Sequence, residues 1–321
     1  MIYLTFILAA TVVVGAAIYL NQFGDVISRK SSLSGAVVGT FLIAGATSLP
    51  ELTTSLTAVY IDSPDIAVGN MLGSNVFNLL ILAVVDLIYR KKRLFQHINH
   101  KESMPSALFG ILFLVIIGFS LLLPGSIELF GVGIEMIVVV VLYILSMKFV
   151  AKEEMLVQQE EPARKDISLR KAVIGFSLAA FMVFVSGSIL SISGDALAQS
   201  TGMNASFIGS FLIAASTSLP ELVTVVAAFK LANYNMAIGS ILGSNLFNIQ
   251  LLALTDALYR KGPILAVVDT SHVFIAFLGF VMSLVIIYLL IRPTIIRNSW
   301  RYAAPSLLMT VLYVVISYMI F

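Results

Sequence analysis

Long apolar runs alternate with short polar stretches along almost the whole chain. Ten of these runs come close to or exceed the roughly 20 residues that a helix needs to cross a bilayer. They span residues 2–20, 34–60, 65–89, 104–123, 126–149, 169–190, 205–229, 235–258, 270–291 and 302–321. The pattern therefore predicts an all-α membrane protein with ten transmembrane helices and no soluble domain. The first run lacks a basic leader and a cleavage site, so we expect it to remain as a helix.

Composition agrees with this class of protein. Hydrophobic residues make up 59% of the chain, charged residues only 11%, and the mean hydropathy is +1.02. A chain with so little polar surface cannot cover a water-soluble globule. The absence of cysteine excludes disulfides, thiolate metal sites and a cysteine nucleophile. We therefore expect the lipid bilayer to be the main partner, with no nucleic acid and no obligatory protein partner.

Basic residues fall on alternate loops of the ten-helix arrangement. The odd-numbered loops hold 17 of the 19 Lys and Arg residues, and the even-numbered loops hold only Arg260 and Lys261. Because basic loops remain in the cytoplasm, this asymmetry predicts a multi-pass protein of the plasma (cell inner) membrane with both termini outside. The charged segment 151–168 is then expected to be a cytoplasmic linker.

The two halves of the chain are copies of each other. Residues 36–91 align with residues 206–261 without a gap, and 27 of the 56 pairs are identical. Five predicted helices separate equivalent points, and this odd number inverts the second copy in the membrane. We therefore expect two inverted five-helix repeats, 1–150 and 169–321. The polar pairs Gly24-Asp25 and Gly194-Asp195 are expected to form turns after the first and sixth helices.

Each repeat carries a carboxylate inside an apolar run. The stretch Thr47-Ser48-Leu49-Pro50-Glu51 recurs as Thr217-Ser218-Leu219-Pro220-Glu221. A carboxylate is costly in hydrocarbon and indicates a functional site. Pro50 and Pro220 are predicted to break their helices, because each lacks a backbone N–H and frees the carbonyl four residues earlier. Hydroxyl, carbonyl and carboxylate oxygens are thus expected to meet at two broken helices near the membrane midplane.

A second pair of motifs supplies further polar side chains. The stretch 69–78, with sequence GNMLGSNVFN, is matched by the stretch 239–248, with sequence GSILGSNLFN. Ser74 and Asn78 share one face of a helix, and Ser244 and Asn248 share the equivalent face. These four side chains add hydroxyl and amide oxygens to the candidate site.

Other recurring residues are interpreted as structural. Asn75 and Asn245 point about 100° away from the polar face, which is typical of packing or hydrogen-bonding residues. Asp86 and Asp256 precede a Tyr-Arg-Lys terminus, so an interfacial role is expected for them. The glycine pairs at 69/73 and 239/243 are expected to let another backbone approach closely.

The candidate ligands are all oxygens, which favours a hard cation. Ca²⁺ takes about 6 to 8 oxygen ligands in adaptable geometry, whereas Mg²⁺ prefers a tighter octahedron and keeps its waters. Two glutamates neutralise one divalent ion, two Na⁺ or two protons, so competition for one pair of carboxylates gives exchange. All three histidines lie near the ends of spans, and proton coupling is therefore expected to fall on the glutamates.

With these motifs the chain resembles the cation/calcium exchanger superfamily, in particular the compact prokaryotic sodium/calcium exchanger type. The repeats of that family read G-T-S-L-P-E and G-N-x-x-G-S-N, and the match covers 36–91 and 206–261. This chain departs at Ala46 and Ser216, where the family often has Gly, and at Ser240, where it often has Asn. The resemblance implies a secondary-active antiporter that exchanges Ca²⁺ for Na⁺ or H⁺ and needs no cofactor.

Carried over position by position, the resemblance also implies a set of ligands. Glu51 and Glu221 would be the central Ca²⁺ ligands, with Thr47 and Thr217 beside them. The other implied ligands are Ser48, Ser218, Ser74, Asn78, Ser244, Asn248 and the backbone carbonyls of Ala44 and Ala214. The resemblance further implies alternating access, in which the first and sixth helices slide as a gate against a fixed four-helix core.

One position and three alternatives qualify this expectation. Some sodium/calcium exchangers carry Asp where this chain has Asn248, so two carboxylates instead of three favour less electrogenic exchange or H⁺ as the counter-ion. The alternatives are a Ca²⁺/H⁺ exchanger, an exchanger of Mg²⁺ or Mn²⁺, and a cation channel. Inverted broken helices favour a carrier over a channel. An enzyme is disfavoured, because serine catalysis needs a nearby base and no histidine lies in the middle of a span.

Overall fold

The computed structural model describes residues 1–30, 47–96, 98, 100–123, 127–157, 167–230, 232–292 and 299–321, and within these it is almost entirely helical. Its α-helices are α1 (Ile2–Lys30), α3 (Leu49–Tyr60), α4 (Pro64–Ile88), α5 (His100–Leu122), α6 (Ile134–Val157), α7 (Leu169–Thr201), α8 (Ala205–Phe207), α9 (Ala214–Thr217), α10 (Leu219–Lys230), α11 (Tyr234–Leu258), α12 (Ser271–Ile291) and α13 (Ser299–Ile320). Three further turns are helical, namely η1 (Leu94–Gln96), the π-helical η2 (Ile208–Ile213) and η3 (Ile264–Ala266).

Seven of the described helices are long and apolar enough to cross a membrane. They cover residues 2–27, 64–88, 103–122, 169–201, 234–258, 271–291 and 300–320. The segments 205–217 and 219–230 form one further span if they are counted together across a bend of 43°. The prediction of a helical, multi-pass membrane protein is confirmed. The count of ten remains a prediction, because the second predicted span begins outside the described residues and α6 has a shorter apolar part, 134–147.

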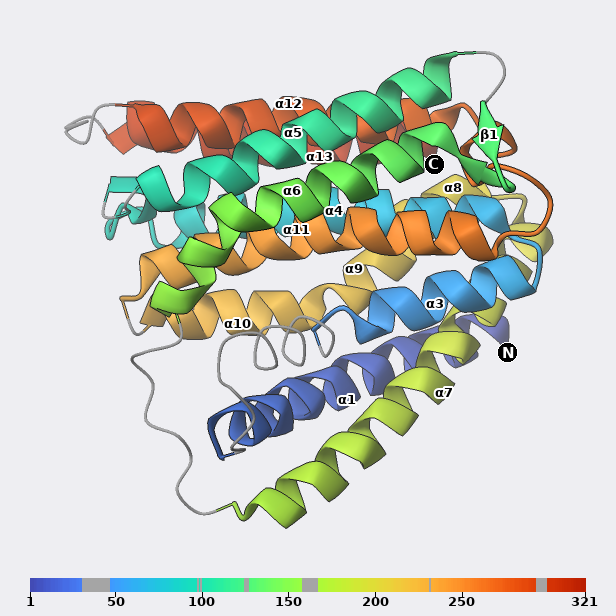
Figure 1. Ribbon diagram of the computed structural model, residues 1–321, viewed down its shortest axis with the longest axis horizontal. Coiled ribbons are helices and arrows are strands. Elements are labelled where there is room, and N and C mark those ends of the chain that lie inside the picture. Colours follow the sequence, from blue (N-terminus) through green and yellow to red (C-terminus); the bar gives the residue numbers. More distant parts are fainter. Residues whose placement is uncertain are drawn as a thin grey trace.

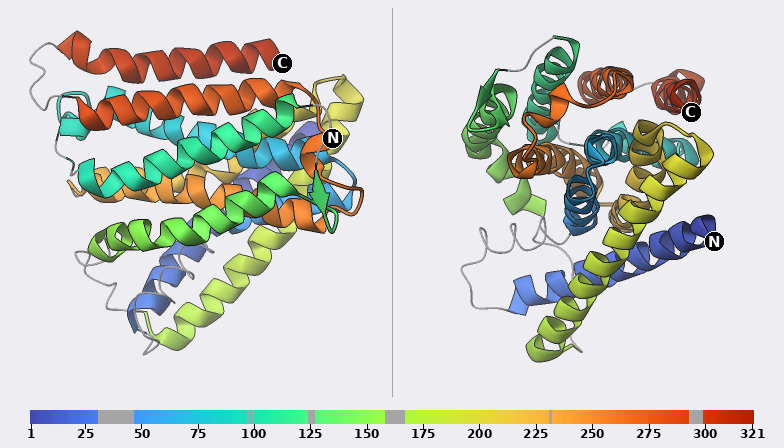
Figure 2. Two further views of the ribbon diagram at one scale, coloured as in Figure 1. Left: turned by 45° about the horizontal axis from the view of Figure 1, so that its top comes forward. Right: turned by 90° about the vertical axis from the view of Figure 1, so that its right-hand side faces the viewer.

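Two pairs of long helices run in opposite directions. Figure 1 shows α1 and α7 lying side by side and antiparallel, and α4 and α11 are likewise antiparallel near the centre of the bundle. Viewed from the end in Figure 2, α1 and α7 are strongly inclined to the remaining helices. The pair therefore forms a distinct layer on one side of the bundle.

The polar Gly-Asp pairs do not form the predicted turns. The helix α1 continues through Gly24 to Lys30, and α7 continues through Gly194 to Thr201. Tertiary packing explains the continuity at Gly194, because a Cβ atom there would lie 2.8 Å from Ile213 Cδ1. The glycine is thus a point of close helix contact. At the true end of α7, Gly202 has a φ of +74° and caps the helix.

The predicted fifth span, 126–149, starts later than expected because a small hairpin precedes α6. Strands β1 (Glu128–Leu129) and β2 (Val132–Gly133) are antiparallel, with Leu129 opposite Val132. The turn residues Phe130 and Gly131 have φ values of +56° and +81°, as tight hairpins require. The backbone N–H of Gly133 donates to Asp256 Oδ2 at 2.8 Å. A distant carboxylate therefore holds the hairpin.

Asp86 and Asp256 are buried against neighbouring segments, close to the ends of α4 and α11, and the interfacial role expected for them stays a prediction. Each is 1% exposed. Asp86 accepts hydrogen bonds from the hydroxyls of Tyr302 and Ser306 on α13. Asp256 accepts from the backbone N–H groups of Gly133 and Ile264, the latter at 2.6 Å. Both carboxylates thus fasten the end of a central helix to a neighbouring segment.

Candidate cation-binding site

The two carboxylate motifs share one backbone geometry at a helix break. Ser218 separates α9 from α10 with φ −92° and ψ 3°. Ser48 precedes α3 with φ −97° and ψ 9°. In both repeats the proline follows two residues later, where a missing N–H costs no helical hydrogen bond. The sequence therefore starts a new helix at the same point of each repeat.

Glu51 and Glu221 lie in the first turns of these new helices. Both side chains are buried, with exposures of 1% and 6%. The first turn of a helix favours negative charge, because unpaired backbone N–H groups point towards it. Ser218 Oγ donates to Glu51 Oε1 at 3.3 Å, and the two carboxylates interact electrostatically. Two like charges without water need a cation or protons between them.

Asn70 ties the two halves of the site together. Its side-chain nitrogen donates to the backbone carbonyl of Glu51 at 3.1 Å and to the hydroxyls of Thr54 and Ser55 at 2.6 and 2.9 Å. Its side-chain oxygen accepts from Thr217 Oγ1 at 3.2 Å. A threonine hydroxyl has one proton, so donation to Asn70 or to the Ala214 carbonyl leaves its lone pairs for another partner.

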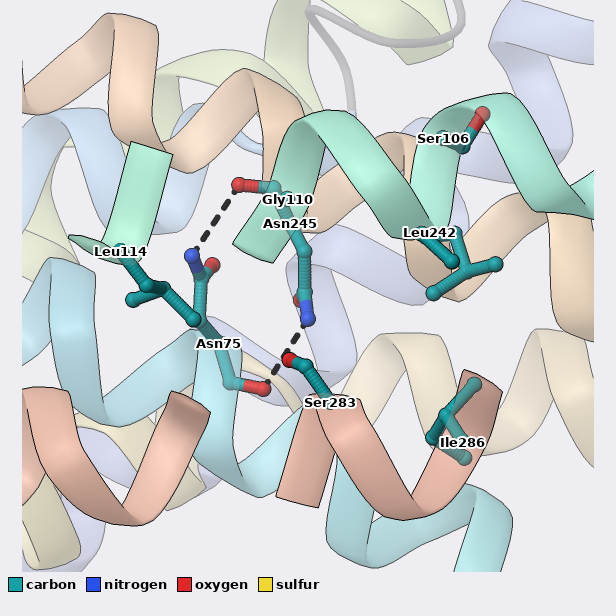
Figure 3. A pocket seen from close by; sticks show the side chains of 9 residues that line it. Asn75, Ser106, Gly110, Leu114, Leu242, Asn245, Ser283 and Ile286 are labelled. Carbon is teal, nitrogen blue, oxygen red and sulfur yellow. Dashed lines mark hydrogen bonds between the residues drawn. The ribbon is translucent and has the colours of Figure 1, made fainter. Parts of the chain in front are cut away.

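The central helices α4 and α11 meet through a reciprocal pair of asparagines. Asn75 donates to the backbone carbonyl of Asn245, and Asn245 donates to that of Asn75, both at 3.1 Å (Figure 3). The side-chain oxygens of the same pair accept from Asn248 and Asn78 at 3.1 and 3.0 Å. A cavity of about 10 Å³ beside the pair is near the minimum for one water molecule. The structure thus gives Asn75 and Asn245 the hydrogen-bonding role expected for them.

Several buried oxygens in this region have no hydrogen-bond partner among the described residues. They are Glu51 Oε2, Glu221 Oε2, Ser74 Oγ, Asn78 Oδ1 and Asn248 Oδ1. Of their four helices, α4 and α11 pack against each other, and each also packs against α3 and α10. A buried unpaired oxygen is costly, and a group of them is suited to a ligand that supplies positive charge. Carboxylate, amide and hydroxyl oxygens are the ligands that hard cations use.

The remaining predicted ligands differ in burial and in hydrogen bonding. Ser48, Thr217 and Ser218 are buried, whereas Thr47 and Ser244 are partly exposed. The backbone carbonyl of Ala214 already accepts hydrogen bonds from the Ser218 N–H and the Thr217 hydroxyl, both at the end of the same helix. Ala44 lies outside the described residues.

Sequence reasoning missed two residues of this region, Asn70 and Ser210. The counterpart of Asn70 is Ser240, so the repeat does not mark it as a pair. Ser210 Oγ is buried without a described partner, and the Ser210 backbone fills the space above Gly73. A Cβ atom on Gly73 would lie 2.1 Å from the Ser210 carbonyl oxygen, so the expected close approach at this glycine is observed. The glycine pattern marks Gly73 as a point of close approach, but no feature of the sequence identifies Ser210 as the residue that approaches it.

Long apolar helices around a group of buried, unpaired oxygens are typical of a membrane protein that handles cations. The model of the sodium/calcium exchanger protein family matches residues 1–152 and 171–321. The chain therefore belongs to the sodium/calcium exchanger protein family. It is a membrane-embedded cation antiporter and not an enzyme, its ions are substrates, and it uses no cofactor.

Individual relatives agree with this membership, and solved structures share the fold. The inner membrane protein YrbG of Escherichia coli is 26% identical over 265 residues, 80% of each chain. The sodium/calcium exchanger MaX1 of Methanosarcina acetivorans is 24% identical over 319 residues, 89% of this chain and 90% of its own. The fold is similar to that of native YfkE, with a TM-score of 0.69, 17% identity and coverage of 98% and 91%. It is also similar to the sodium-calcium exchanger NCX_Mj, with a TM-score of 0.57, 21% identity and 98% coverage of both chains.

Proposed function

We propose that the protein exchanges Ca²⁺ for Na⁺ or H⁺ by alternating access, with Glu51 and Glu221 as the shared cation ligands. The observation that carries this proposal is the pair of buried carboxylates, each with an oxygen that has no described partner. Ca²⁺ between them supplies two positive charges to two negative ones. Two monovalent ions do the same, so the two kinds of ion compete for one site.

The further ligands in this proposal are Ser74, Asn78 and Asn248, whose oxygens are unpaired in the same region. Thr217 supports the site as an acceptor because its proton is used by Asn70 or Ala214. Ser218 would leave Glu51 and turn its hydroxyl oxygen to the cation. The proposed set is completed by Ser48, Thr47, Ser244 and the carbonyls of Ala44 and Ala214. The Ala214 carbonyl would have a lone pair for the cation when the Thr217 hydroxyl donates to Asn70 instead.

The neutral Asn248 bears on the counter-ion. Two carboxylates balance one Ca²⁺, two Na⁺ or two H⁺, and the described residues contain no cluster of three acidic, histidine or cysteine ligands. We infer that exchange is less electrogenic than a design with three Na⁺ per Ca²⁺. A strong current at three-to-one stoichiometry during Na⁺-driven Ca²⁺ uptake would contradict this inference.

The proposed architecture is ten transmembrane helices in two inverted repeats, 1–150 and 169–321, with linker 151–168 in the cytoplasm and both termini outside. The antiparallel course of α1 and α7, and of α4 and α11, supports the inversion (Figure 1). The 17 basic residues of the odd-numbered loops support the orientation.

In this mechanism α1 and α7 slide against the helices that hold the site. Their strong inclination to the rest of the bundle supports a separate moving layer (Figure 2). Two described polar contacts between α7 and the core would exchange in this slide. The Thr57 and Ser188 hydroxyls lie 3.0 Å apart, and Ser63 donates to Asp195 at 2.8 Å. An empty pair of carboxylates resists occlusion because bare charge is costly away from water.

The experiment is uptake of radiolabelled Ca²⁺ into proteoliposomes under an outward Na⁺ gradient, or under an outward H⁺ gradient without Na⁺. We expect one gradient to drive uptake, and Mg²⁺ or Mn²⁺ to compete weakly. The variant in which Glu51 and Glu221 are both replaced by Gln is expected to show none. Uptake driven by neither gradient in correctly inserted protein would remove Ca²⁺ as the substrate, and single-channel currents would favour a channel.

A further inference from the structure

A groove of about 480 Å³, whose lining contains neither glutamate, lies where the C-terminal end of α4 meets the first turns of α13. Its wall is apolar, and its rim carries two guanidinium groups and an indole. The residues are Leu87, Ala304 and Leu307 on the wall and Arg90, Trp300 and Arg301 on the rim. The groove therefore combines a cationic mouth with a hydrophobic floor.

The rim has the chemistry that recognises a phosphate. Arg90 and Arg301 are both exposed, and guanidinium groups bind phosphate oxygens through paired charged hydrogen bonds. Trp300 is 74% exposed on a membrane-spanning helix, as aromatic residues at the level of lipid headgroups are. These three side chains come from the ends of two different spans, so the rim lies at the membrane surface.

Two neighbouring cations, Lys92 and Arg292, lie against aromatic rings outside the groove. Lys92 lies over the rings of Tyr89 and Phe229, at 5.9 and 5.3 Å from their centroids. Arg292 stacks on Tyr302 at 4.5 Å and donates to its carbonyl. Among the basic residues at this end of α4 and α13, Arg90 and Arg301 are the ones that line the groove.

The apolar floor of the groove faces the lipid side of the bundle. Leu307 on the floor is 46% exposed, and its neighbours outside the groove, Ile88 and Leu308, are 68% and 48% exposed. Exposed apolar side chains on spanning helices contact acyl chains. A soluble anion would use the rim and leave the floor bare. A lipid uses both parts, because its phosphate and its chain are covalently joined.

We propose that this groove binds one anionic glycerophospholipid. The phosphate lies between Arg90 and Arg301, and an acyl chain lies against Leu87, Ala304 and Leu307. The lipid then joins the same two helices that the Asp86 hydrogen bonds to Tyr302 and Ser306 join from inside the bundle. Its binding does not depend on which ions the protein exchanges.

The test is native mass spectrometry of the full-length protein in detergent with added phosphatidylglycerol or phosphatidylcholine. We expect the wild type to retain one phosphatidylglycerol and to prefer it over phosphatidylcholine. The R90Q/R301Q variant is expected to lose this retention by roughly tenfold or more, since each basic residue near a headgroup contributes about a factor of five. Retention at the wild-type level in that variant would overturn the proposal.

Two further variants separate a specific site from general attraction. K91Q/K92Q removes two charges from the same loop outside the groove and is expected to keep the lipid. An equal loss in both double variants would overturn a specific site. A304F fills the apolar part of the groove and keeps both arginines. This variant is expected to lose the lipid. Retention of the lipid would overturn the acyl-chain contact. Melting temperatures without added lipid, matched to the wild type, show that each variant is folded.

Discussion

The two repeats share the backbone geometry of their helix breaks but differ in the surroundings of their glutamates. Ser48 and Ser218 differ by only a few degrees in φ and ψ, and both glutamates occupy the first turn of the helix that follows. Their surroundings differ. The Glu51 carboxylate accepts a hydrogen bond from the Ser218 hydroxyl, and the Glu51 backbone carbonyl accepts one from the Asn70 side chain. Ser240, the counterpart of Asn70, donates to the carbonyl of Ala237 in its own helix. The geometry of the breaks is thus the same in both repeats, whereas the residue at position 70 or 240 makes different hydrogen bonds in each.

The largest expected effect comes from removing the charge that the halves have in common. Glu51→Gln and Glu221→Gln each leave one carboxylate for a divalent ion, and breaking a buried charge pair costs about 3–5 kcal/mol. We expect Ca²⁺ exchange to fall by roughly a hundredfold or more in both variants, as measured by uptake into proteoliposomes. A variant with near-normal uptake would show that its glutamate is not a ligand and that the halves differ more than proposed.

A smaller effect is expected where the halves differ. Asn70→Ser makes the first repeat like the second and frees Thr217, Thr54 and Ser55 from their shared partner. Loss of a residue that orients ligands typically costs about 10–100-fold in metal affinity. We expect the KM for Ca²⁺ to rise within this range while the protein remains folded.

The matched control for Asn70 is Ser240→Asn, which makes the second repeat like the first. Because Ser240 bonds only within its helix in the described structure, we expect this variant to change the KM for Ca²⁺ much less. Equal KM values for wild type and Asn70→Ser would show that Asn70 is a packing residue only.

The next effect concerns the contact between the two repeats, at Gly73 and Ser210. Gly73→Ala places a Cβ atom against the Ser210 backbone, and overpacking of this kind costs about 1–3 kcal/mol. We expect a lower melting temperature in detergent. Gly118→Ala is the control, since no described atom lies within 4 Å of its Cβ position, and it should leave the melting temperature unchanged or slightly raised.

The smallest effect is expected at the turns that follow α3 and α10. Asp62 and its counterpart Ala232 have φ values of +62° and +57°, but only Asp62 has a charged partner, Lys261 at 2.5 Å. Alanine in this left-handed conformation costs about 1 kcal/mol. Ala232→Gly should therefore raise the melting temperature by roughly 2 °C. A decrease would mean that the turn is not strained.

Local patterns predicted much of this molecule, and tertiary contacts explain where they failed. Apolar runs and the repeated motifs predicted the helical membrane fold, and the glutamates lie in the helices expected for them. Gly24-Asp25 and Gly194-Asp195 carry turn residues, yet packing of α7 against Ile213 keeps Gly194 in a helix. The hairpin before α6 depends on Asp256, more than a hundred residues away. Asn70 was missed because comparison of the repeats finds what they share and overlooks what one of them changed.

The reciprocal hydrogen bonds of Asn75 and Asn245 also bear on the origin of the chain. A contact in which a residue bonds its own equivalent is the contact at the two-fold axis of a symmetric dimer. A single half, inserted into the membrane in both directions, would form it with a second copy of itself without any change of sequence. The asparagine pair is therefore a contact that would suit a homodimer of such halves. Duplication and fusion of the gene for one half would then keep this contact within a single chain.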